Sequence, residues 1–92
     1  MRSEIVVHLR VNRSEGVRHV LKKNRFAIYL KNMQTEKLIP IGDKPIGLLD
    51  EAHFEIICIY NGSRCLEDMG ISQKALQRNT VCKKIECATF EN

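Results

Sequence analysis

Near-regular alternation of apolar and polar side chains at the start of the chain, broken only at Val6, is the feature that most restricts its fold. Residues 4–11 read Glu-Ile-Val-Val-His-Leu-Arg-Val. A repeat of two is typical of a β-strand with one buried face. The sequence therefore predicts a strand over 4–11, with His8 and Arg10 on its outer face. The side chains predicted to point inward are Ile5, Val7, Leu9 and Val11.

A helix over 15–23 is predicted to follow this strand. Ser14 is a suitable N-cap, and apolar side chains then recur at helical spacing. These inward-facing residues are Val17, Val20 and Leu21. The residues predicted to point outward are Arg18, His19, Lys22 and Lys23. We expect Asn24 to take the left-handed conformation that ends many helices. The alternative is a hairpin that turns at residues 14–16.

Shorter patterns divide the rest of the chain. The expected elements are a strand over 25–31, a brief strand over 37–41, a central strand over 53–60, two helical pieces over 64–69 and 72–78, and a last strand over 80–90. The order strand, helix, strand, strand, strand, helix, strand is close to the split β-α-β arrangement of ferredoxin-like domains.

The fold class predicted from this order is α+β. We expect a small mixed sheet of about five strands, in a ferredoxin-like or related split β-α-β order, with helices packed on one face. Because the chain has 92 residues, we expect a single domain over 1–92.

The longest apolar run of the chain, residues 56–60, is far too short to cross a membrane. With no secretory signal pattern, the sequence predicts a cytoplasmic protein that binds no membrane.

Four cysteines are present: Cys58, Cys65, Cys82 and Cys87. Their spacing fits no common zinc pattern, so we expect reduced cysteines that serve core packing, with no metal and no cofactor.

The segment of residues 66–78 has two interpretations. It resembles the middle of a helix-turn-helix DNA-binding motif, with Gly70 at the turn. A capped corner between two helical pieces would explain the same residues.

Positive charge is concentrated at the front of the chain. Residues 1–32 hold eight Lys or Arg and two acids, a net charge of +6, whereas residues 33–70 hold three bases and seven acids, a net charge of −4. Such asymmetry bears on the partners of a protein and on its association with them. It predicts an anionic partner.

Cations interleaved with an aromatic residue predict a nucleic-acid surface, because several RNA-binding sheets stack bases on aromatics and hold phosphates with cations. We predict a small, non-catalytic module for RNA or single-stranded nucleic acid. The predicted binding residues are Arg10, Arg13, Arg18, Lys22, Lys23, Tyr29 and Lys31. The alternative is an inhibitory or regulatory domain whose charged surface docks on an acidic protein surface. An exposed edge at 37–41 could also join two copies as a homodimer.

Catalysis is not predicted. His8 or His19 could act as acid or base, but no Glu–His or His–His pair stands at an informative spacing. The sequence also lacks a glycine-rich phosphate loop and a serine elbow.

Overall fold

The first strand has the buried and exposed sides that its alternation predicts. A computed structural model describes residues 2–91. In it, β1 runs over Arg2–Arg10, and Ile5, Val7 and Leu9 are buried in the core. The other strands are β2 (Ala27–Asn32), β3 (Leu38–Pro40), β4 (Phe54–Gly62) and β5 (Cys82–Phe90). The helices are α1 (Glu15–Lys23) and α2 (Gln73–Arg78), with short 3-10 turns η1 (Val11–Arg13) and η2 (Glu67–Met69).

The five strands form one antiparallel sheet in the order β3-β2-β4-β1-β5. The prediction of a mixed sheet is therefore wrong. A mixed sheet needs at least one pair of neighbouring parallel strands, and β1 and β2, which the helix α1 connects, would form that pair if they were adjacent. They are parallel, but β4 lies between them and is antiparallel to both, so no parallel pair forms.

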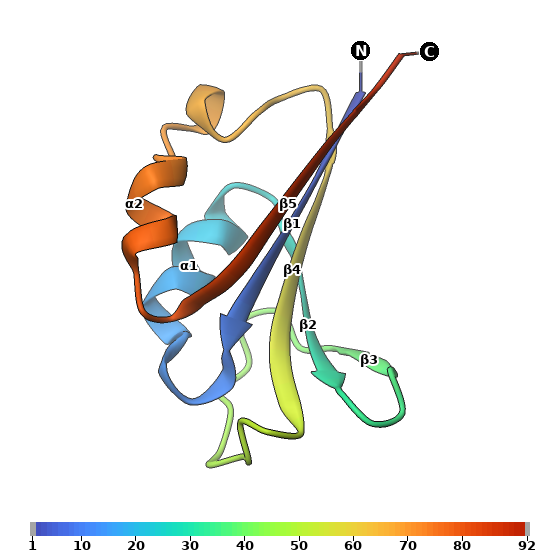
Figure 1. The fold of residues 1–92 in the computed structure, drawn as a ribbon, viewed down its shortest axis with the longest axis vertical. Helices are drawn as coiled ribbons and strands as arrows, with labels where there is room; N and C mark the ends of the chain where they lie inside the picture. The colour runs from blue at the N-terminus through green and yellow to red at the C-terminus, as the bar shows by residue number, and fades with distance from the viewer. Residues whose placement is uncertain (1, 92) are drawn as a thin grey trace.

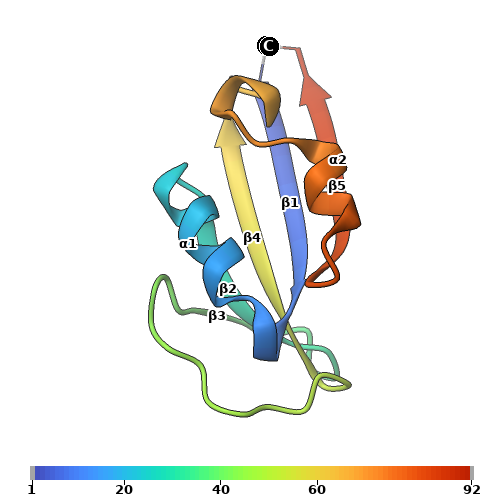
Figure 2. The same cartoon turned by 90° about the vertical axis from the view of Figure 1, so that its left-hand side faces the viewer.

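Both helices cover the same face of this sheet, as predicted (Figure 1). Figure 2 looks onto that face and shows α1 in front of β2 and α2 in front of β5, with β4 and β1 visible between the two helices. Apolar side chains from the two layers form one core cluster, to which the segments outside the strands contribute Val11, Leu21, Phe26, Leu66 and Ile71. The opposite face carries neither helix, and we call it the open face.

The helix α1 has the predicted bounds, but it is rotated about its axis relative to the prediction. Arg18, expected outside, is buried at 5% exposure, whereas Val20, expected inside, is 48% exposed. The loop after β3 lies against this flank of α1 and covers Arg18. The left-handed residue is also not the predicted one: Asn24 has φ −91° and Arg25 has φ 69°.

Between β4 and β5, residues 66–78 form the capped corner between two helical pieces, and not a helix-turn-helix. Gly70 takes the left-handed conformation with φ 75°. Ser72 caps α2, because its hydroxyl oxygen accepts a hydrogen bond of 3.2 Å from the Ala75 N–H. The three-residue turn η2 is not a helix of the length that a helix-turn-helix needs, so that resemblance does not extend to the structure.

The cysteines do not share one environment. Cys58 is buried in the core, in agreement with the prediction, and Cys82 is half-buried. Cys65 and Cys87 are exposed, so the prediction that the cysteines serve core packing is wrong for these two.

Within residues 2–91, no helix is long and apolar enough to cross a membrane.

Candidate functional site

The predicted nucleic-acid residues are divided between two layers of the molecule. Arg10, Tyr29 and Lys31 belong to strands, where the last two alternate with the inward-facing Ile28 and project from the open face. The others belong to η1 and α1, in the helix layer on the opposite side: Arg13, Arg18, Lys22 and Lys23. The structure therefore does not bring the seven residues together on one surface.

Arg18 is engaged inside the protein. One of its terminal nitrogens donates hydrogen bonds to the carbonyl oxygens of Gly42, at 3.0 Å, and Lys44, at 2.6 Å. These bonds attach the loop after β3 to the flank of α1, so Arg18 stabilises the fold. Arg10 is also partly compensated, because its guanidinium lies 3.9 Å from the Glu51 carboxylate.

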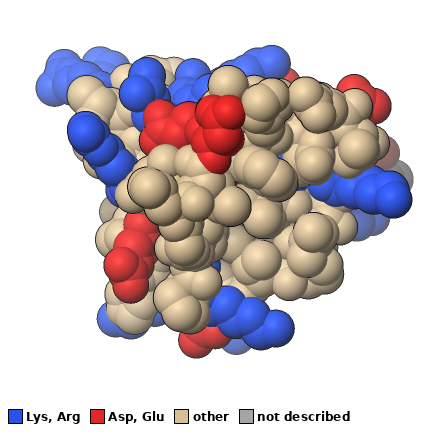
Figure 3. Space-filling view, turned by 90° about the horizontal axis from the view of Figure 1, so that it is seen from below, with Lys and Arg blue, Asp and Glu red and all other residues tan. Residues whose placement is uncertain are grey.

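Surface charge is dispersed as well. Figure 3 views the molecule from below Figure 1 and shows Lys and Arg at several separate places around the rim, with Asp and Glu between them. Phosphate affinity grows with the number of cations that contact one backbone at the same time. This side of the molecule offers no continuous basic stripe.

A compact group of ionisable residues lies on the open face, and we call it the open-face charge cluster: His8, Glu55, Lys83, Lys84 and Glu86. Glu55 is its buried member, at 4% exposure. His8 Nδ1 lies 3.0 Å from one Glu55 oxygen, and Lys83 donates to the other oxygen at 3.0 Å. On the far side, His8 Nε2 lies 3.5 Å from Glu86, which pairs with Lys84 at 2.6 Å.

The neighbouring side chains lower the pKa values of both carboxyl groups in the cluster. Burial alone raises the pKa of Glu55, but the hydrogen bonds from His8 and Lys83 outweigh burial and hold that pKa below its ordinary value. The hydrogen bond with Lys84 lowers the pKa of Glu86. Both ring nitrogens of His8 face carboxylates, so neither is directed at a ligand. The arrangement favours a structural ion network over acid–base catalysis.

Replacing Glu55 is expected to destabilise the protein in a pH-dependent way. Because the folded pKa is lowered, ionised Glu55 stabilises the fold above the ordinary glutamate pKa, and this contribution disappears as the pH falls through the lowered value. Glu55→Gln should lower the free energy of unfolding by about 1–2 kcal/mol at neutral pH, and by much less near about pH 3.

Urea unfolding at the two pH values measures this difference. Glu51→Gln is the matched control, since the half-exposed pair that Glu51 forms should contribute under about 0.5 kcal/mol at either pH. An equal loss for Glu55→Gln at both pH values would mean that packing, and not charge, is responsible.

Exposed apolar residues gather at the other edge of the sheet. Of the six large apolar side chains exposed among the described residues, three belong to the β2–β3 hairpin: Met33 at 39%, Leu38 at 45% and Ile39 at 53%. We call these three residues the hairpin surface. Leu38 pairs with Lys31 and so lies on the open face, whereas Ile39 pairs with the inward-facing Leu30. The hairpin surface therefore wraps around the sheet edge.

A hollow of about 330 Å³ adjoins the hairpin surface on the open face. Its apolar lining consists of Val6, Leu38 and Ile57, and its polar lining of His8, Lys31 and Glu36. Lys31 is half-buried and forms no ion pair with any of the described residues 2–91. The hollow thus combines an apolar lining with one cation, Lys31, and one carboxylate, Glu36.

No protein-family model, curated protein or solved structure matches this chain.

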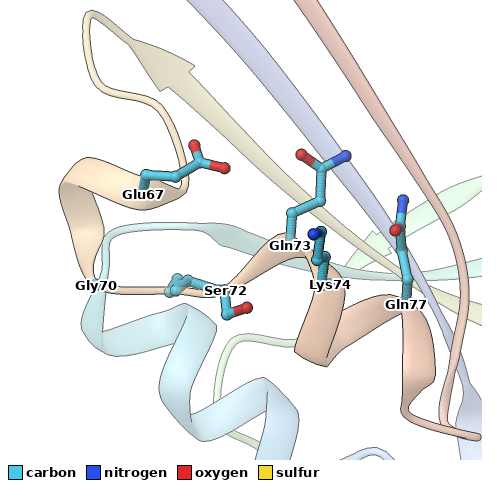
Figure 4. A pocket seen from close by; sticks show the side chains of 7 residues that line it. Glu67, Gly70, Ser72, Gln73, Lys74 and Gln77 are labelled. Atoms are coloured by element: carbon cyan, nitrogen blue, oxygen red, sulfur yellow. The ribbon is translucent and has the colours of Figure 1, made fainter.

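A larger hollow, of about 640 Å³, opens beside the corner between η2 and α2 (Figure 4). Gln73, Lys74 and Gln77 reach it from α2, and Glu67 reaches it from η2. Its charged groups have opposite signs, and the remaining polar groups are amides and a hydroxyl. Nothing in this lining assembles an acid–base pair or an anion clamp. In residues 2–91, His, Cys, Asp and Glu form no group of three or more that could hold a metal ion.

Sequence reasoning missed both the charge cluster and the hairpin surface. His8 and Glu55 are 47 residues apart in the chain, so no local spacing links them. The hairpin surface did leave a signal, because residues 38–41 (Leu-Ile-Pro-Ile) are four consecutive apolar residues in a segment otherwise rich in turn formers. A short edge strand whose side chains are apolar on both faces indicates an exposed apolar surface, which is typical of an interaction site.

Proposed function

We propose that this protein is a non-catalytic protein-interaction module that binds a partner protein through the hairpin surface and the adjoining hollow. The observation that carries the proposal is the concentration of exposed Met33, Leu38 and Ile39 on one hairpin. Exposed apolar residues that gather on one segment beside polar ones often mark a protein-binding site. The proposal keeps the protein partner of the alternative prediction, but it places the contact on apolar residues and not on the charged surface.

The character of the hollow indicates what the partner presents. Its apolar lining of Val6, Leu38 and Ile57 suits one apolar side chain. Lys31, half-buried and without an ion pair in residues 2–91, suits a neighbouring carboxylate. We therefore propose a partner segment in which an apolar residue is flanked by Asp or Glu.

Recognition at this edge is expected to depend on side chains. The strand β3 has only three residues, and Pro40 has no N–H to donate. A partner strand would therefore gain few main-chain hydrogen bonds here. The homodimer that the sequence suggests for 37–41 has little support for the same reason.

Photo-crosslinking tests the location. A photoreactive amino acid replaces Leu38 in one variant and Val20 in the other, and both are expressed in cells. Val20 is a matched control because it is apolar, 48% exposed and located on α1, away from the hairpin. We expect a discrete protein adduct from the Leu38 position alone. Equal adducts from both positions, or none at Leu38, would contradict the proposal.

Nucleic-acid binding stays a prediction with its own test. The purified chain is titrated with single-stranded RNA, single-stranded DNA and duplex DNA at low and moderate salt, because phosphate-driven binding weakens steeply with salt. Salt-sensitive retardation that disappears when Arg13, Lys22 and Lys23 are replaced together would favour nucleic acid over a protein partner. Arg18 is unsuitable for this test because of its buried position.

We also infer that the fold is a ferredoxin-like arrangement with an added edge strand. The support is the order of elements: without β3, the chain reads β-α-β-β-α-β. The placement of β4 between β1 and β2 agrees with a split β-α-β unit.

A further inference from the structure

The strand β5 presents a long free edge. It spans nine residues, Cys82–Phe90, and is the last strand in the sheet order, next to β1. Its outer side pairs with no other strand among residues 2–91. An unpaired edge of this length is a template on which another strand can pair. It lies at the opposite side of the sheet from the hairpin surface.

The register with β1 shows which main-chain groups of β5 are free. The Arg10 N–H donates to the Val81 carbonyl oxygen at 2.8 Å, so Arg10 directs its main-chain groups toward β5. Because this direction alternates along a strand, His8 and Val6 do the same. Their partners are Lys84 and Glu86. The main-chain groups of the residues between and beyond these partners face outward: Ile85, Cys87 and Thr89.

The side chains along this edge are self-complementary. A two-fold axis at Ile85 places Lys84 opposite Glu86 of a second copy, and Glu86 opposite its Lys84. The two side chains share the open face and lie 2.6 Å apart within one chain, so the axis assembles four alternating charges. It also places the outward main-chain groups of both Ile85 residues in hydrogen-bonding positions.

We propose that two copies of this chain pair antiparallel along β5, centred on Ile85, to form one continuous ten-stranded sheet. The pairing is centred on Lys84, Ile85 and Glu86. At its two ends Cys87 of one copy opposes Lys83 of the other copy, which lies where the register between β5 and β1 shifts. An axis at Glu86 would place two carboxylates face to face, and an axis at Cys87 would place Lys84 opposite Phe90. Only the axis at Ile85 pairs opposite charges on both sides.

Charge reversal tests this register. Lys84→Glu and Glu86→Lys each replace two attractive contacts by two repulsive ones, so each variant alone should dimerise at least about tenfold more weakly than the natural chain. Mixed together, the two variants restore both attractive contacts, and the mixture should form a heterodimer of natural affinity. Sedimentation velocity over a wide concentration range measures all three samples, and circular dichroism verifies folding.

Two single-proline variants test the same pairing without changing any charge. Cys87→Pro removes an outward N–H inside the paired stretch, whereas Thr89→Pro removes one outside it, and neither N–H bonds to β1. The first variant should be monomeric and the second should dimerise as the natural chain does. A natural chain that stays monomeric, a mixture that gains no affinity, or a dimer lost with Thr89→Pro and kept with Cys87→Pro would each overturn the proposal. Because β5 is remote from Leu38, failure here leaves the crosslinking result unaffected.

Discussion

Replacing Arg18 with alanine is expected to lower the free energy of unfolding by about 2–3 kcal/mol. The guanidinium is buried, and its two hydrogen bonds to the Gly42 and Lys44 carbonyls join the loop after β3 to α1. Removing it leaves both carbonyls without their donor and opens space beside the helix. Hydrogen bonds from a charged donor are among the stronger contributors to stability.

Urea unfolding followed by circular dichroism measures this loss. Lys22→Ala is the matched control, because Lys22 is an exposed cation on the same helix and should contribute within about 0.5 kcal/mol. An Arg18→Ala protein as stable as the natural chain would show that these bonds contribute nothing. The expected loss also means that any substitution of Arg18 would change folding as well as binding, so Arg18 cannot serve as a probe of binding.

Local periodicity predicted the elements well because it reflects which side chains enter the core. The alternation of Ile5, Val7 and Leu9 and the continuous apolar run of β4 both correspond to the observed strands. The same reasoning assigned the wrong environment to Arg18 and Val20. It counts arginine as polar, but loop carbonyls 24 and 26 residues away accept hydrogen bonds from one terminal nitrogen of this buried guanidinium. A local window does not contain that information.

The candidate surfaces were less predictable than the fold, because they depend on which layer each segment enters. The charge of residues 1–32 indicated a basic surface, but β1 and β2 belong to the sheet and α1 to the layer that covers it. Alternating segments of one basic stretch therefore face different directions. His8 and Glu55 meet only because β1 pairs with β4.

Leu38→Asp is expected to weaken binding of the crosslinked partner by about 30-fold or more, which corresponds to the loss of one interface hot spot. Leu38 lies at the junction of the hairpin surface and the hollow, so a carboxylate there would be buried against apolar groups in the complex. It would also repel the acidic residue that we expect beside Lys31. The free protein should remain folded, because Leu38 is exposed on a short edge strand.

The most direct test of the account is a calorimetric titration of the purified partner into three proteins: the natural chain, Leu38→Asp and Val20→Asp. We predict that Val20→Asp binds as the natural chain does and that Leu38→Asp loses about 30-fold or more in affinity. Equal affinity for Leu38→Asp and the natural chain, with both proteins folded, would contradict the assignment of the hairpin surface as the binding site.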